Sequence, residues 1–166
     1  MFNYKKINRN IFYISFIIVG ILTILYQINF EDFWIDEMQS FWIANPELSW
    51  NETVQRHKYD YHNPILFNLT LKYFLDIFSY NPEIARYLPL LFGSLFLIII
   101  GPITYQVKKD NTFLLTTLLA CLSIYIIKYS QEVRPYALLL LTSALNIYFF
   151  LKLYNKVGNN KKNSIF

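Results

Sequence analysis

The sequence predicts an all-α protein, a polytopic bundle in which about four helices cross a membrane. Of its 166 residues 55% are hydrophobic and 16% are charged, whereas soluble domains typically carry about 25% charged residues. The apolar residues are collected into long blocks rather than spread at helical or strand spacing. Lysines lie at the ends of these blocks and form no continuous stripe, so the net charge of +4 does not indicate a nucleic-acid partner.

The first apolar block, residues 11–28, has no charged residue and follows a basic N-terminal stretch. This length is enough to cross a bilayer core. A basic stretch before an apolar block is also typical of a secretory signal, but no small-residue cleavage site follows here. We therefore predict an uncleaved span whose N-terminus lies in the cytoplasm.

Residues 29–83 form a loop that we place on the outer face of the membrane. Asn45 and Pro46 interrupt any helix that runs on from Asp36, and Ser49 with Glu52 has the spacing of a capping box at the start of a second helix. The loop is rich in carboxylates up to residue 63. These are Glu31, Asp32, Asp36, Glu37, Glu47, Glu52 and Asp60.

The apolar segment 65–78 is too short to be a typical span. Its polar residues Asn68, Lys72 and Asp76 recur every four positions, which places them on one stripe of a helix. Pro64 suits the first turn of that helix. We predict that the helix lies along the lipid boundary, with a Lys72–Asp76 pair as the simplest interpretation of its charges.

Three further spans are predicted at 84–107, 112–128 and 136–153, so that residues 1–166 form a single membrane domain with both termini cytoplasmic. Ten of the 11 acids then lie outside, Asp110 being the exception. Crossing by 65–78 would move the later basic residues outside, against the positive-inside rule. Nine of the 15 basic residues lie inside in the four-span arrangement: Lys5, Lys6, Arg9, Lys108, Lys109, Lys152, Lys156, Lys161 and Lys162.

This arrangement brings acids, cations and aromatics to one membrane face. The adjacent carboxylates Asp36 and Glu37 are candidate bases or metal ligands, and His57 and His62 are candidate proton carriers. Arg86, Glu132 and Arg134 reach the same face, and arginine suits a phosphate partner. Simpler interpretations stay open: an aromatic belt with solvated acids, local pairs of Arg86 with Glu83 and of Arg134 with Glu132, and an ordinary loop role for His57.

Such a face suits a substrate whose lipid tail lies between spans and whose phosphate head lies at the surface. A carboxylate there can take a proton from an incoming hydroxyl while cations stabilise the departing phosphate. This chemistry is glycosyl transfer from a polyprenyl-phosphate sugar.

Five pieces of the chain, in order, resemble the N-terminal part of the polytopic C-type glycosyltransferases. That class includes the dolichyl-phosphate-mannose protein mannosyltransferases and the aminoarabinose transferases, of glycosyltransferase family 39 type. No piece is specific by itself, but the order and the placement between apolar blocks cover nearly the whole chain. The pieces are 33–40 (FWIDEMQS), 62–66 (HNPIL), 83–89 (EIARYLP), the basic turn at 108–109 and 129–137 (YSQEVRPYA).

The resemblance implies that Asp36 is the catalytic carboxylate, with Glu37 beside it, and that the sugar is transferred with inversion. It implies that the histidine-proline piece opens a juxtamembrane helix bordering the site. It further implies a set of residues that contact the lipid phosphate or the sugar: His62, Arg86, Glu132, Arg134 and Tyr136.

Two departures from that family change the expectation. Asn63 stands where the family has a proline, and family members are several times longer, with many more spans. We therefore expect an N-terminal part of a larger architecture, with a second polypeptide supplying the remaining spans.

Other functions remain open from the sequence. The first alternative is a non-catalytic membrane subunit or a decayed fragment without activity of its own, and the second is a small transporter-like protein. No cofactor is required by the residues, although a divalent metal is left open. The expected location is a bacterial-type inner or plasma membrane, and the sugar and the acceptor are not specified.

Overall fold

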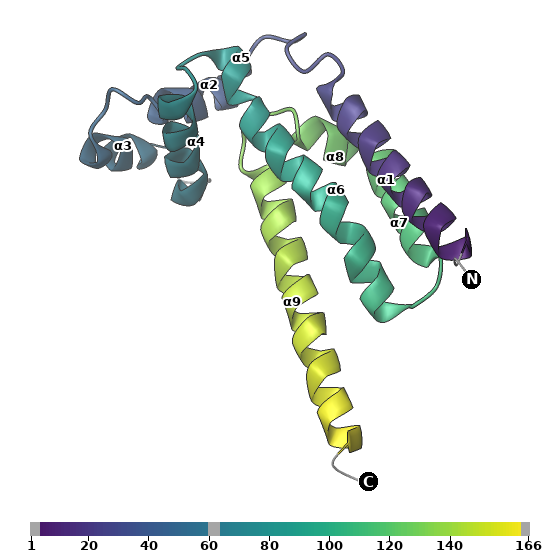
Figure 1. The fold of residues 1–166 in the computed structure, drawn as a ribbon. Coiled ribbons are helices and arrows are strands. Elements are labelled where there is room, and N and C mark those ends of the chain that lie inside the picture. The colour runs from purple at the N-terminus through teal and green to yellow at the C-terminus, as the bar shows by residue number, and fades with distance from the viewer. Residues whose placement is uncertain (1–3, 60–63, 164–166) are drawn as a thin grey trace.

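The computed structural model describes residues 4–59 and 64–163, with side-chain surroundings given for residues 8–59 and 64–157. Within these ranges the secondary structure is α-helical, without strands (Figure 1). The all-α class predicted from the sequence is therefore confirmed. The helices are α1 (Tyr4–Leu25), α2 (Ile35–Ile43), α3 (Trp50–His57), α4 (Ile65–Ile77), α5 (Pro82–Ala85), α6 (Tyr87–Val107), α7 (Thr112–Cys121), α8 (Ile124–Tyr129) and α9 (Tyr136–Asn163).

The long helices form a bundle around α6. Helix α6 packs against α9, α7 and α1, and α1 also packs against α7. Their shared core includes Ile24, Leu97, Cys121 and Ala144, one from each of the four helices. Helix α6 can occupy the centre because it is apolar on all sides, as expected for a helix surrounded by others.

Among the described residues, three helical segments are long and apolar enough to cross a membrane: Asn8–Leu25, Pro82–Val107 and Tyr136–Val157. The first and last have only 17% of their residues buried, so most of their apolar side chains face outward. Exposed apolar surface of this extent is rare on soluble monomers. The predicted spans 11–28, 84–107 and 136–153 thus each correspond to a helix of suitable length.

The predicted span 112–128 differs from the structure, because it is divided into α7 and α8. Helix α7 ends at Cys121, and Ser123 adopts an extended backbone with φ −72° and ψ 113°. An extended residue cannot continue the helical hydrogen-bond ladder, and serine has a low helix propensity. Helix α7 alone is too short to span, so the fourth crossing stays a prediction.

Helices α2 to α5 form a separate group at the end of the bundle where α1 ends (Figure 1). Their core contains Ala44, Phe67, Leu71 and Ala85, and it continues to Val133 before α9. The predicted break after α2 and the predicted second helix are both confirmed. At the start of α3 the Glu52 carboxylate accepts a hydrogen bond from the Ser49 backbone N–H at 2.8 Å.

Helix α4 turns two residues of its polar stripe inward, the buried Asn68 and Lys72, whereas Asp76 is exposed. The Lys72 ammonium donates to three backbone carbonyls, those of Asn45 at 2.6 Å, Pro46 at 3.0 Å and Leu48 at 2.7 Å. The expected Lys72–Asp76 pair is therefore replaced by a lysine that stabilises the loop between α2 and α3. The opposite face is apolar and exposed, with Leu66, Tyr73 and Ile77. Placement of α4 at a lipid boundary stays a prediction.

Candidate functional site

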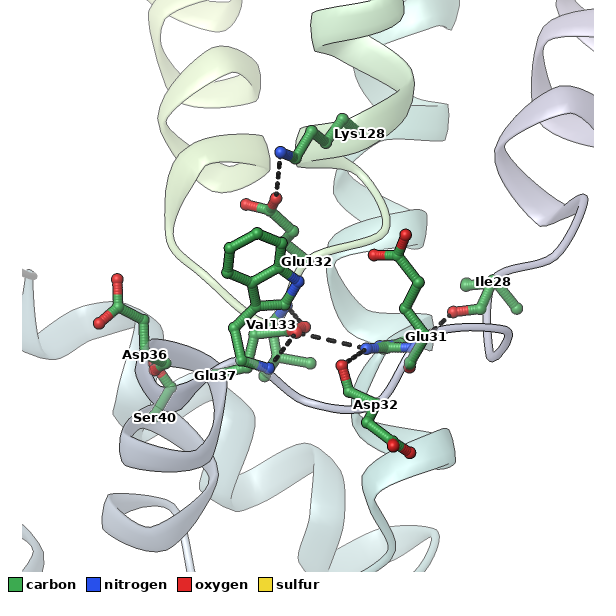
Figure 2. Close-up of polar contacts among 11 residues, drawn as sticks. Ile28, Glu31, Asp32, Asp36, Glu37, Ser40, Lys128, Glu132 and Val133 are labelled. Atoms are coloured by element: carbon green, nitrogen blue, oxygen red, sulfur yellow. Dashed lines mark hydrogen bonds and ion pairs between the residues drawn. The ribbon is translucent and has the colours of Figure 1, made fainter.

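The site lies where the loop after α1 meets the start of α6 and the turn before α9 (Figure 2). The chain reverses at Gln27, whose φ of 55° is in the left-handed region. This turn directs the backbone carbonyls of Ile28, Glu31 and Asp32 toward Arg86. Main-chain oxygens therefore supply most of the hydrogen-bond acceptors around the Arg86 guanidinium.

Arg86 lies between α5 and α6, and both terminal nitrogens of its guanidinium donate to other groups of the protein. Its Nη1 donates to the carbonyls of Ile28 at 2.9 Å and Glu31 at 2.6 Å, and its Nη2 donates to the carbonyl of Asp32 at 3.3 Å. The guanidinium also lies 5.0 Å from the ring centre of Phe33. Only 7% of the side chain is exposed. Through these contacts Arg86 joins the loop that follows α1 to the start of α6.

Glu37 is the partner that balances the buried charge of Arg86. Its Oε2 lies 3.3 Å from Arg86 Nη2 and accepts from the backbone N–H of Trp34, while Oε1 accepts from the backbone N–H of Val133 at 2.8 Å. The Glu37 side chain is 2% exposed, and both of its carboxylate oxygens accept hydrogen bonds. A buried ion pair is tolerated only when further hydrogen bonds satisfy both members, and this pair meets that condition on the carboxylate side.

Asp36, one position earlier in α2, has a different environment. Its side chain is 68% exposed and lies 3.7 Å from Nη2 of Arg134, which is 9% exposed. Arg134 Nη1 also donates to the Asp36 carbonyl at 3.0 Å. The local pairs of Arg86 with Glu83 and of Arg134 with Glu132 are thus replaced by contacts that connect distant parts of the chain.

Lys128 and Glu132 form an ion pair at the edge of the site. Lys128 Nζ lies 3.6 Å from Glu132 Oε1 and 5.3 Å from the ring centre of Trp34. Burial raises the pKa of the Glu132 carboxyl, and the positive charge of Lys128 offsets this only in part. Glu132 is therefore a carboxyl that retains its proton to higher pH than an exposed glutamate.

Two cavities meet at these residues. The larger has a volume of about 420 Å³ and is lined by Trp34, Glu37, Arg86, Lys128, Gln131 and Glu132, among others. The smaller, about 70 Å³, is lined by Trp34, Asp36, Glu37, Glu132, Arg134 and Tyr136.

The two cavities share Trp34, Glu37 and Glu132. The structure therefore brings together Asp36, Glu37, Arg86, Glu132, Arg134 and Tyr136 from the residues named by the sequence. The remaining predicted residue, His62, lies outside the described residues.

His57 is not part of either cavity lining. It ends α3, and its Nδ1 lies 3.0 Å from the side-chain nitrogen of the buried Asn68. Among the residues that the structure describes, no group of three or more histidine, cysteine, aspartate or glutamate side chains could hold a metal ion.

Three residues that line the larger cavity were not among the predicted site residues, although one of them, Gln131, lies in the 129–137 piece that the resemblance places beside the site. Trp34 and Lys128 line the larger cavity, and the side-chain nitrogen of Gln131 donates to the carbonyls of Ile24 at 2.8 Å and Tyr26 at 3.0 Å. The four-residue spacing of Lys128 and Glu132 is a signal for their pair. Gln131 gives no such signal, because its partners lie more than a hundred positions away.

Over residues 4–59 and 64–163 these features define a helical protein with three segments suited to cross a membrane and a charged site where its two helical groups meet. No protein-family model matches the chain, and neither a curated protein nor a solved structure is significantly similar to it. The resemblance to C-type glycosyltransferases therefore depends on the sequence motifs alone.

Proposed function

We propose that this chain is a membrane glycosyltransferase, or the N-terminal part of one, that uses a polyprenyl-phosphate sugar as donor. The observation that supports this proposal best is that two adjacent carboxylates, both beside the cavities described above, differ in exposure to solvent. Glu37 is buried and neutralised by Arg86, whereas Asp36 is exposed beside Arg134. An exposed carboxylate held in position by a nearly buried cation suits a general base.

In the proposed reaction Asp36 takes the proton of an acceptor hydroxyl. The hydroxyl oxygen then forms a bond to the anomeric carbon, and the bond from that carbon to the phosphate oxygen breaks. Polyprenyl phosphate leaves with the electron pair, and the sugar configuration is inverted. Because the proton and the electron pair are both accounted for, no oxidant, reductant or covalent enzyme intermediate is needed.

The cation best suited to the leaving phosphate is Lys128. Its side chain is 55% exposed at the larger cavity, and its single carboxylate contact, to Glu132, is 3.6 Å long. Arg86, in contrast, directs both terminal nitrogens to carbonyls and to Glu37. We therefore assign phosphate stabilisation to Lys128, and to Arg86 the positioning of the loop that carries Asp36.

The proposal includes the four-span topology in a bacterial-type plasma membrane, with both termini on the cytoplasmic side. The start of α1 at Tyr4 and the end of α9 at Asn163 both lie at the end of the bundle remote from α2–α5, which supports this topology (Figure 1). The site would then lie at the outer face, where the lipid tail of the donor can remain between helices. A second polypeptide is proposed to supply further spans around the donor.

The test uses the full chain reconstituted in liposomes with labelled polyprenyl-phosphate sugars. Loss of a general base typically lowers the rate about 10²- to 10⁴-fold, so we expect Asp36→Asn to abolish measurable transfer without affecting membrane insertion. The matched control is Asp110→Asn, because Asp110 is an exposed carboxylate outside both site cavities. Unchanged transfer by Asp36→Asn would refute the role of Asp36.

A second candidate function is a non-catalytic membrane subunit. One observation favours it: the side chains of Arg86, Glu37 and Gln131 all form hydrogen bonds to backbone atoms of this chain, so these polar groups have a structural use. In that case wild-type protein and Asp36→Asn both release no sugar from any donor, and both associate equally with a larger membrane protein in pull-downs from solubilised membranes.

A further inference from the structure

A separate cavity, whose charged lining residues are basic, lies at the end of the bundle remote from Asp36. Its volume is about 400 Å³, and α1, α6, α7 and α9 all contribute to its lining. The residues that matter for its chemistry are Arg9, Tyr105, Gln106, Phe113, Tyr148 and Lys152. It shares no residue with the two cavities described above.

The walls of this cavity follow from one proline in α6. Pro102 has no N–H, so the carbonyl of Ile98 one turn earlier lacks its helical donor. The Tyr13 hydroxyl of α1 donates to that carbonyl instead. Gly101 lets the tyrosine ring come this close, because a Cβ there would lie 2.5 Å from the ring. Helices α1 and α6 are therefore fixed together beside the cavity.

Arg9 is one of the two cations in the lining of this cavity. Its guanidinium carbon lies 5.5 Å from the ring centres of both Tyr105 and Phe113. Its buried Nε has no hydrogen-bond partner, and no carboxylate within the described residues pairs with Arg9 or with Lys152. Asp110 at the same end is engaged by Lys108 at 3.2 Å. The cavity thus holds two cations without a counter-charge in this part of the chain.

We propose that this cavity binds the phosphate of an anionic phospholipid headgroup. A guanidinium fork matches phosphate oxygens, and Lys152 adds a second cation with a flexible stem. The site lies at the ends of the candidate spans, where Asn8–Leu25 begins and Pro82–Val107 ends, which is the level of lipid headgroups. This inference does not depend on the proposed glycosyl transfer.

The surroundings favour a lipid over a soluble anion. Aromatic and proline side chains make up much of the cavity wall beside the two cations. The outer surfaces of the adjoining helices are also apolar, as shown by exposed Phe12 on α1 and exposed Phe149 on α9. Acyl chains attached to a bound phosphate would cover such surfaces, whereas inorganic phosphate would leave them unchanged.

The experiment measures lipid binding to the purified full chain in neutral detergent by native mass spectrometry. Phosphatidylglycerol and phosphatidylcholine with identical acyl chains are compared. We expect the anionic lipid to bind about tenfold more tightly, and Arg9→Gln or Lys152→Gln each to weaken it by about tenfold, as for a lost charged hydrogen bond. The control is Lys109→Gln, at the same end but outside the cavity lining, which should bind as wild type does.

Lys152 is exposed, so Lys152→Gln keeps the bundle core intact even where Arg9→Gln lowers the yield of folded protein. Equal affinity of both lipids, or wild-type affinity in Lys152→Gln and Arg9→Gln, would overturn the proposal. Displacement of the lipid by inorganic phosphate at a concentration near the lipid's own Kd would also overturn it, in favour of a soluble anion.

Discussion

At the scale of single residues, two adjacent acids have opposite roles because they lie on different faces of α2. Successive residues of a helix point about 100° apart, so Glu37 faces the junction with Arg86 and Val133 while Asp36 faces outward. Removing one partner of a buried pair costs about 3–5 kcal/mol, because it leaves the other charge uncompensated. The Glu37–Arg86 pair therefore maintains the position of Asp36.

The raised pKa of Glu132 predicts a pH dependence. The folded state holds this proton to higher pH than the unfolded chain, so the stability contribution is present at low pH and is lost as pH rises through the folded-state pKa. We expect Glu132→Gln to remove this loss. The measurement is the thermal midpoint of both proteins from about pH 4 to about pH 8, a range that includes the ordinary glutamate pKa of about 4.3.

The difference between the two curves isolates Glu132 from other carboxylates, which titrate in both proteins. Burial is the larger cause of the shift, so the variant should be relatively more stable toward neutral pH. A difference that stays constant with pH would contradict the assignment.

At the scale of elements, small residues decide how closely the helices approach. A Cβ on Gly20 would lie 2.6 Å from the sulfur of Cys121, and one on Gly93 would lie 2.0 Å from Oγ of Ser130. These distances are far shorter than van der Waals contact, so each glycine marks a direct helix contact. Close packing through small residues is the usual basis of helix association in membranes.

Gly93→Ala tests this packing in α6. The added methyl group meets the Ser130 side chain just before the turn that carries Glu132, so we expect a loss of about 1–3 kcal/mol in stability. Ser130→Gly in the same chain should restore part of it. Stability is measured by denaturant titration in detergent.

Ser94→Ala is the matched control, since Ser94 is the next residue of α6 and its buried hydroxyl has no hydrogen-bond partner. Its replacement should be neutral or stabilising. Equal stability of Gly93→Ala and wild type would show that α6 and Ser130 are not in contact.

At the scale of the whole molecule, the two ends of the bundle differ in charge and in structure. One end carries the α2–α5 group with the acids around Asp36, and the other carries the Lys108–Asp110 turn and the cavity of Arg9. The chain runs between these ends in alternate directions, first as α1, then as α6, then as α7 with α8, and last as α9 (Figure 1).

Topology can be tested with single cysteines at Asn51 and Asn111, both exposed, in a chain with Cys121→Ala. We expect a membrane-impermeant maleimide to label position 51 from outside in intact cells and position 111 only after permeabilisation. Labelling of both positions from outside would refute the four-span arrangement.

Part of this fold could be predicted because its causes are local. Block hydropathy identified α1, α6 and α9, and the Ser49–Glu52 capping box identified the start of α3. The break at Ser123 could not be predicted from hydropathy, which is uniform across residues 112–127. The sequence predicted that Asp36, Glu37, Arg86 and Arg134 lie close together, but it did not predict which acid pairs with which arginine.

By itself, the sequence determined the long apolar segments that became α1, α6 and α9 and the capped start of α3, because propensity and hydropathy act over a few neighbouring residues. Only the tertiary structure decided that Arg86 pairs with Glu37 rather than Glu83 and that Lys72 binds carbonyls rather than Asp76. A buried cation takes the partners that the packed backbone brings within reach, and this proximity depends on how distant segments meet.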